Sequence, residues 1–199
     1  MVTPKKGKAE KFWDRTALTY DQEEGPDEKI YLQIIERVRD YLKATDVVLD
    51  FGCGTGSVTN KMASSVKQVY AIDLSSEMIK IARRKAESQK ITNVEYVQST
   101  IFSDDLKPNT YDVIFGFYVL HLLEEPEEVL RRIGQLLKPG GILISVTPCM
   151  GENSFFASAF LSVLSKIGIV PPVRSFKSRD LEDLLENEMA EMLAFSKLE

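Results

Sequence analysis

The stretch Val48-Leu49-Asp50-Phe51-Gly52-Cys53-Gly54-Thr55-Gly56 decides the fold, because a short apolar strand runs directly into three glycines spaced two apart. Glycine accepts the positive φ and the close backbone approach that a ligand-binding turn between a strand and a helix requires. A dinucleotide fingerprint places its third glycine three positions after the second, where the helix packs against the strand. Ser57 and Thr59 occupy those positions here, so the sequence argues against a dinucleotide.

Apolar runs and helical patterns alternate along the rest of the chain, which predicts βαβ units and a parallel sheet with helices on both faces. The pattern predicts helices over 75–89 and 126–137, the second ended by Pro139-Gly140-Gly141, and two helices within 5–43 that are broken near Gly25-Pro26. The expected strands span residues 47–49, 66–72, 94–97, 113–117 and 142–146.

Three further motifs follow the glycine stretch in order: 69–75, a strand ending in Asp73; 111–121; and 136–144, a turn through Pro139-Gly140-Gly141. With the glycine stretch they cover roughly residues 46–148 and resemble class I S-adenosylmethionine-dependent methyltransferases of the small-molecule type. The resemblance implies an α/β, Rossmann-like doubly wound sheet of five parallel strands in the order 3-2-1-4-5. It also implies in-line methyl transfer to a small-molecule acceptor, with S-adenosylhomocysteine as the product.

The resemblance implies a cofactor site beyond the carboxyl ends of the strands. Asp50 would meet the methionine ammonium, Asp73 both ribose hydroxyls, Leu74 one adenine face, and Tyr20 the methionine carboxylate, with Trp13 helping to close the pocket. The expected cofactor-binding residues are Tyr20, Asp50, Gly52, Cys53, Gly54, Gly56, Asp73, Leu74, Met78, Thr100, Ile101, Gly116 and Phe117.

Several of these residues have a purely structural alternative. Asp73 is also suited to the start of a helix, where the macrodipole favours an acid, and Asp50 to capping the backbone within the turn. Tyr20 and Trp13 could simply pack on the sheet. Family members carry an acid just after the third strand, against the adenine amino group, where this chain has Thr100. We therefore expect weaker adenine recognition, unless Asp104 or Asp105 substitutes, because a neutral hydrogen bond is weaker than a charge-assisted one.

His121, the only histidine, follows the fourth expected strand beside the expected methyl donor. Methyl transfer from a sulfonium depends mainly on alignment and a dry site. An acceptor that arrives protonated also needs a base, for which a histidine is suited near neutral pH. The alternative is a hydrogen-bonded structural histidine lining the pocket. No metal is expected.

Composition narrows the partners and the location. The net charge of −5 argues against binding to a phosphate backbone. Gly116-Phe117-Tyr118 stands where nucleic-acid amino-methylating enzymes carry an Asn/Asp-Pro-Pro-Tyr/Phe run, which favours a small-molecule acceptor over nucleic acid. Two cysteines give no disulfide framework. With no signal peptide evident and no apolar run long enough to span a membrane, we expect a cytoplasmic protein.

We expect a single methyltransferase domain over 1–199, with an N-terminal helical cap at 1–45, a cofactor-binding core at 46–148, and a lid helix and C-terminal helix at 149–199. The apolar stripe of residues 151–168 suits a lid over an apolar acceptor, a core face, a dimer contact or an interfacial membrane helix.

A helix beginning near Ser178 and a helical stretch at 187–195 replace the family's C-terminal strand hairpin, which leaves the fifth strand as an edge. Either the final helix covers that edge, a partner such as a second copy does, or the protein is a shortened family member with reduced stability. The alternative function is therefore a non-catalytic or partner-dependent S-adenosylmethionine-binding protein. A nicotinamide-dependent oxidoreductase is disfavoured by Ser57 and Thr59.

Overall fold

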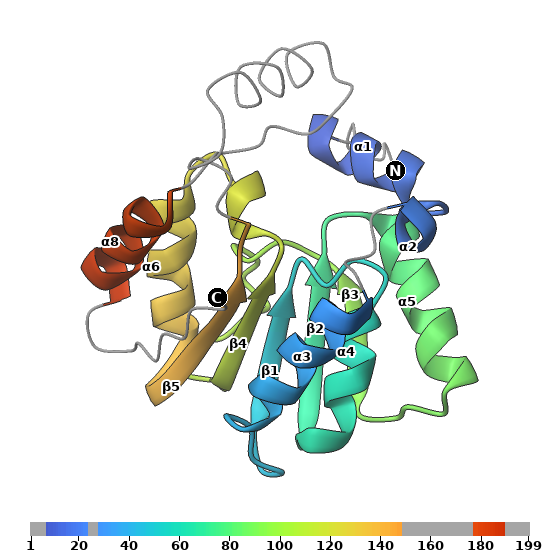
Figure 1. Ribbon diagram of the computed structural model, residues 1–199, viewed down its shortest axis with the longest axis horizontal. Helices are drawn as coiled ribbons and strands as arrows, with labels where there is room; N and C mark the ends of the chain where they lie inside the picture. Colours follow the sequence, from blue (N-terminus) through green and yellow to red (C-terminus); the bar gives the residue numbers. More distant parts are fainter. Residues whose placement is uncertain (1–6, 24–27, 149–176, 190–199) are drawn as a thin grey trace.

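The computed structural model describes residues 7–23, 28–148 and 177–189, and in this part of the chain five parallel strands form one sheet. The strands lie in the order β3-β2-β1-β4-β5 (Figure 1), which confirms the predicted order. They are β1 (Val47–Phe51), β2 (Gln68–Asp73), β3 (Val94–Gln98), β4 (Tyr111–Phe117) and β5 (Leu137–Val146).

Helices cover both faces of this sheet (Figure 1). The helices α3 (Glu28–Arg39), α4 (Ser57–Met62) and α5 (Ser76–Ser88) lie on one face, and α6 (Pro126–Leu136) and α8 (Ser178–Met189) on the other. Successive strand side chains point to opposite faces. Val48 of β1 therefore joins the core under α3, α4 and α5, while its neighbour Leu49 joins the core under α6 and α8.

The start of β5 differs from the prediction. Residues 137–141, expected as the end of a helix and a turn, already belong to the strand, and α6 ends at Leu136. The pairing of β4 with β5 shifts register between Tyr111 and Val113, and Gly140 adopts a φ of +76°. This irregularity lets the strand continue through Pro139 and Gly140, residues that usually interrupt a regular strand.

The amino-terminal segment also differs, since it forms three helices instead of two. They are α1 (Lys8–Thr16), α2 (Tyr20–Glu23) and α3. The additional break falls where the amide of Thr19 donates to the carbonyl of Thr16 at 3.1 Å, one residue tighter than an α-helical bond. Ala17, in this break, is buried, so the turn is fixed by packing that sequence periodicity does not report.

The C-terminal helix α8 begins at Ser178, as predicted, and packs against α6. Its Leu181 and Leu185 are buried in the same core as Leu130 and Ile133 of α6. The expected helix at 151–168 lies outside the described residues, as does the stretch 187–195 beyond Met189. Within the described residues, no helix combines the length and the apolar character needed to cross a membrane.

Candidate functional site

The turn between β1 and α4 is built on three glycines with positive φ. Gly52, Gly54 and Gly56 have φ of +72°, +54° and +75°. A Cβ on Gly52 would lie 2.7 Å from Val119 Cγ2, and one on Gly56 would collide with the Tyr96 hydroxyl. Gly54 is different, because a Cβ there would meet only Tyr20 Cε1, at 3.9 Å. The outer glycines are therefore required by packing, while the middle one leaves an open surface below Tyr20.

Asp73, the last residue of β2, connects this glycine turn to the next helix. Its Oδ2 accepts from the Gly54 amide at 3.0 Å and its Oδ1 from the Ser75 amide at 2.8 Å. The cap of α5 is Ser75, whose Oγ accepts from the Met78 amide, so Asp73 is not the helix cap. Burial raises the pKa of Asp73, the two amides oppose this rise, and the charge of Asp14 adds to it.

Asp50, near the end of β1, is almost completely buried at 2% exposure. Its Oδ2 accepts from the Thr59 hydroxyl at 2.5 Å, and within the described residues the carboxyl group does not cap the turn. Burial raises the pKa of Asp50 to about 7; the Thr59 hydrogen bond lowers it and the negative charge of Asp73 raises it. Burial and the same two carboxyl groups raise the pKa of the Cys53 thiol, which is therefore neutral.

The amino-terminal helices α1 and α2 lie beyond the carboxyl ends of the strands (Figure 1). Two carboxylates attach them there. Asp14 Oδ1 accepts from Ser75 Oγ at 2.7 Å, at the start of α5. Asp21 accepts from Thr55 Oγ1 at 2.6 Å and pairs with Lys85 Nζ at 2.6 Å. These contacts hold the segment over the glycine turn.

The aromatic rings of this segment form a small cluster of their own. Trp13 packs edge-on against Tyr20 and Phe12, with ring centroids 6.0 and 5.0 Å apart. Tyr20 is also the residue that faces Gly54. The three rings therefore pack together next to the glycine turn, and their role toward a cofactor stays a prediction.

The carboxyl end of β4 borders the other side of the turn. A Cβ on Gly116 would lie 2.8 Å from Phe51 Cε1, so this glycine is required by packing. Tyr118 adopts a φ of +53°, and its amide donates to Val146 O at 2.7 Å. His121 follows in a short 3-10 helix, and its Nδ1 is buried without a hydrogen-bond partner among the described residues. Burial lowers the pKa of His121.

A family model described as a methyltransferase domain matches residues 42–189 of this sequence. The chain belongs to the family of S-adenosylmethionine-dependent methyltransferases. This methyltransferase is 34% identical over 156 residues to an uncharacterized methyltransferase of Geobacillus sp. (strain WCH70), a match covering 74% of this chain and 71% of that protein. It is 28% identical over 172 residues to the malonyl-[acyl-carrier protein] O-methyltransferase of Halalkalibacterium halodurans. That match covers 81% of this chain but 62% of the relative, so the methyltransferase described here spans less than two thirds of that protein's length.

Two solved structures share the fold of this methyltransferase. The phosphoethanolamine N-methyltransferase 2 of Haemonchus contortus gives a TM-score of 0.76 at 20% identity, covering 94% of this chain and 45% of that one. A SAM-dependent methyltransferase of Aquifex aeolicus gives 0.61 at 24% identity, covering 93% and 89%. At these identities the likeness establishes the Rossmann-like fold.

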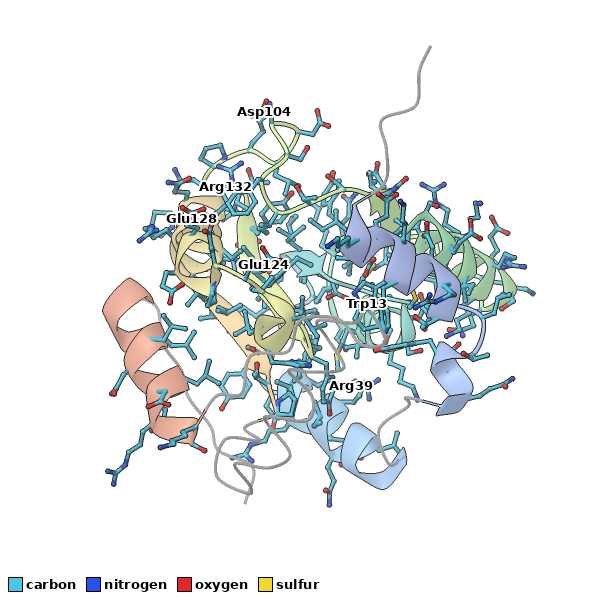
Figure 2. The ribbon with its side chains drawn as sticks, turned by 90° about the horizontal axis from the view of Figure 1, so that it is seen from above. Trp13, Arg39, Asp104, Glu124, Glu128 and Arg132 are labelled. Atoms are coloured by element: carbon cyan, nitrogen blue, oxygen red, sulfur yellow. The ribbon has the colours of Figure 1, made fainter. Side chains whose placement is uncertain are left out.

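The sequence-predicted residues of this methyltransferase gather at the carboxyl edge of the sheet. Leu74 and Met78 lie at the start of α5, Met78 fully buried; Phe117 is buried at the end of β4. After β3, Ile101 is buried and Thr100 is exposed. Asp104 lies at the outer rim of the molecule, away from Trp13 (Figure 2), which does not favour it as a substitute for the missing acid.

Sequence reasoning missed the side chains that attach the cover and support the buried carboxyl groups. They are Asp14, Asp21, Thr55, Thr59 and Lys85. Asp14 and Asp21 lie seven residues apart in the amino-terminal segment, and their partners lie in the glycine turn and on α5. Only the fold brings these segments together. Thr59 could have been found from the sequence, because it lies one helical turn after Gly56 on α4, the helix that follows the strand of Asp50.

Proposed function

We propose that this protein is an S-adenosylmethionine-dependent methyltransferase that acts on a small-molecule acceptor by in-line displacement. The observation that carries the proposal is a pair of carboxyl groups, the buried Asp50 and the half-buried Asp73, on either side of a glycine turn with an open surface at Gly54. A ligand with an ammonium at one end and vicinal hydroxyls at the other matches these two hydrogen-bond acceptors.

The remaining acceptor capacity of the carboxyl groups supports the fit. A carboxylate has about four lone-pair sites. Asp73 accepts from the amides of Gly54 and Ser75 and, more weakly, of Leu74, which leaves room for a further donor. Asp50 uses one site for Thr59. Gly52, Gly54 and Gly56 would hold the methionine part below Tyr20, with Cys53 in the same turn. Leu74, Met78, Thr100 and Ile101 would surround the adenine, and Gly116 and Phe117 would lie at the reacting end.

Bound S-adenosylmethionine supplies a methyl group on a sulfonium, and S-adenosylhomocysteine is the product. The chain's own contribution is alignment, exclusion of water and one proton transfer. The cover formed by α1 and α2 shields the glycine turn from solvent. His121 would act as the base, because burial lowers its pKa and keeps the ring neutral, and its Nδ1 has no partner in the described residues.

The acceptor is proposed to be a small molecule of apolar character, not a nucleic acid. The relatives named as malonyl-[acyl-carrier protein] and ubiquinone biosynthesis O-methyltransferases support this class, as does the net charge of −5. We further propose a single domain over 1–199 and a cytoplasmic location. A homodimer would form through the edge of β5 or the segment 151–168.

Calorimetric titration with S-adenosylmethionine, S-adenosylhomocysteine and NAD tests the proposal. We expect micromolar binding of the first two and none of NAD, followed by transfer of a labelled methyl group to at least one acceptor in a screen of small apolar alcohols, phenols and amines. Binding without transfer to any acceptor would favour the alternative, a non-catalytic or partner-dependent binding protein. An absence of binding would refute the proposed cofactor site.

A further inference from the structure

We infer that Thr59 is the positioning residue of Asp50, and that binding of the cofactor's ammonium group drives a proton from Asp50 into solution. This inference rests on the proposed function. Thr59 is fully buried on α4, and its hydroxyl reaches back to the carboxyl group of Asp50 on β1 at 2.5 Å. The contact joins the strand before the glycine turn to the helix after it.

The surroundings of Asp50 contain no compensating cation. Within the described residues, the Thr59 hydroxyl is the one hydrogen-bond donor to this carboxyl group. The facing groups are Asp73 on β2, which repels a second negative charge, and the Cys53 thiol, which is neutral. Lys85, on α5, is paired with Asp21. A buried carboxylate with one donor and an anionic neighbour is disfavoured, so the pKa of Asp50 is raised to about 7 and much of the unliganded protein holds a proton there at pH 6.5.

An ammonium group beside Asp50 supplies the missing charge. The neutral carboxylic acid then becomes a carboxylate paired with the ammonium, the O–H bond breaks, and its proton leaves to the buffer. No electron transfer or additional reactant is involved. The Thr59 hydroxyl donates to the carboxylate form, so it favours ionisation and holds Oδ2 in place while the charge forms.

Substitution of Thr59 separates this role from simple packing. Thr59→Val keeps the shape and removes the donor, whereas Thr59→Ser keeps the donor and removes a methyl group. Without the donor, Asp50 ionises less readily, so Thr59→Val should weaken cofactor binding about tenfold at pH 6.5, with the difference from wild type closing above pH 8. Thr59→Ser should follow the wild-type pH profile. Loss of packing alone would weaken binding by the same factor at every pH.

Proton release is measured by calorimetry at pH 6.5 in two buffers of different ionisation enthalpy. At this pH the cofactor's own α-amino group stays protonated, since such groups titrate near 7.7–8.0. We expect the wild type to release between about half a proton and one proton, and Asp50→Asn to release none. Asp73→Asn should still release a measurable part of a proton, less than the wild type because the Asp73 charge no longer raises the pKa of Asp50, and release that persists without Asp73 assigns the proton to Asp50. Unchanged release in Asp50→Asn, or a pH-independent defect in Thr59→Val, overturns the inference.

A measurement without cofactor keeps this inference separate from the proposed function. Carbon-13 NMR titration of the aspartate carboxyl carbons in the unliganded protein should show Asp50 titrating near neutral pH, and about one pH unit higher in Thr59→Val. If the wild type binds no S-adenosylmethionine, the proposed function fails. The NMR titration still tests whether Thr59 favours ionisation of Asp50. Equal midpoints for Asp50 in the wild type and in Thr59→Val would refute the role of Thr59.

Discussion

The two halves of the site differ in how their polar groups are held. On the side of β1 and β2, the glycine turn, Asp73 and the start of α5 are joined by a continuous set of hydrogen bonds. On the side of β4, the Nδ1 of His121 is buried without a partner in the described residues, and Tyr118 holds a positive φ. Buried polar groups are normally paired, and strained backbone tends to collect at functional sites.

This difference fits the division of labour in a two-substrate enzyme. In the β1–β2 half the glycine turn, Asp73 and Ser75 are joined before any ligand arrives, although the Nδ2 of Asn60 on α4 has no partner within the described residues. A preformed turn of this kind suits a cofactor that is the same in every turnover. The β4 half keeps an unused acceptor atom, which suits an acceptor molecule that must give up a proton. The predictions below test whether the two halves can be disrupted independently.

Replacing His121 should give the largest effect, and it should fall on turnover. His121→Ala removes the proposed base, so kcat should fall by about 10²–10⁴-fold, while the Kd for S-adenosylmethionine stays within about twofold. Burial lowers the pKa of His121, so the wild-type rate should rise with pH with a midpoint below the ordinary histidine pKa of about 6.5. Steady-state kinetics with any acceptor found in the screen provides the measurement. Loss of cofactor affinity in parallel with kcat would place His121 in the cofactor half instead.

Gly56→Ala should destabilise the cofactor half by about 3 kcal/mol. The new Cβ would collide with the Tyr96 hydroxyl and lie 3.0 Å from the Ala82 Cβ, and overpacking of this kind costs about 1–3 kcal/mol. The φ of +75° adds roughly 1–2 kcal/mol for a residue with a Cβ. Urea unfolding measures the change in the free energy of unfolding.

Gly140→Ala is the matched control for this substitution. Gly140 has nearly the same φ, +76°, but a Cβ there has no atom within 4 Å. Only the cost of the positive φ remains, so the free energy of unfolding should fall by roughly 1–2 kcal/mol. Equal losses in the two variants would show that Tyr96 yields to the added methyl group and that packing around Gly56 is loose.

Asp73→Ala should weaken cofactor binding by about 1.5–3 kcal/mol, the range for hydrogen bonds to a charged group. Part of the loss would come through the protein, because Asp73 also holds the Gly54 amide at 3.0 Å. Asp73→Asn keeps one acceptor oxygen and should lose less. Calorimetry on the three proteins decides the assignment, and unchanged affinity in Asp73→Ala would refute the ribose role.

The sequence was sufficient for the regular part of this molecule. Strand residues 47–49 and 113–117 form continuous apolar runs because both faces of a parallel sheet are buried. Asp73 follows such a run directly, so its place at the carboxyl edge could be predicted. Thr59 shows the limit, since it served only to exclude a dinucleotide, whereas the fold turns it toward Asp50. The predicted start of β5 was wrong because pairing with β4 outweighs the turn preference of Pro139 and Gly140.

The smallest effect is expected where the cover meets the core, at Asp21. Burial alone would raise the pKa of this carboxyl group, but hydrogen bonds from Lys85 and Thr55 and the charge of Lys85 lower it overall. A carboxyl group with a lowered pKa contributes stability above its unfolded pKa of about 3.9 and loses it as the pH falls through the folded value. Asp21→Asn should therefore cost about 0.5 kcal/mol at pH 7, because the pair is partly exposed and screened by solvent. The cost should disappear as the pH falls through the folded pKa of Asp21, which lies below 3.8.

Cofactor affinity distinguishes this anchor from an ordinary surface ion pair. If Asp21 holds the cover over the glycine turn, Asp21→Asn should speed cofactor dissociation several-fold, and the difference from wild type should shrink with salt, because salt screens the Asp21–Lys85 pair that only the wild type has. Glu77→Gln is the control, since it removes another ion pair of α5, with Lys80, at the exposed surface. Stopped-flow dissociation measured on both variants decides the matter. Equal rates would mean that the aromatic packing of Trp13 against Tyr20 holds the cover in place without Asp21, and that the cofactor half is closed by apolar contact instead of charge.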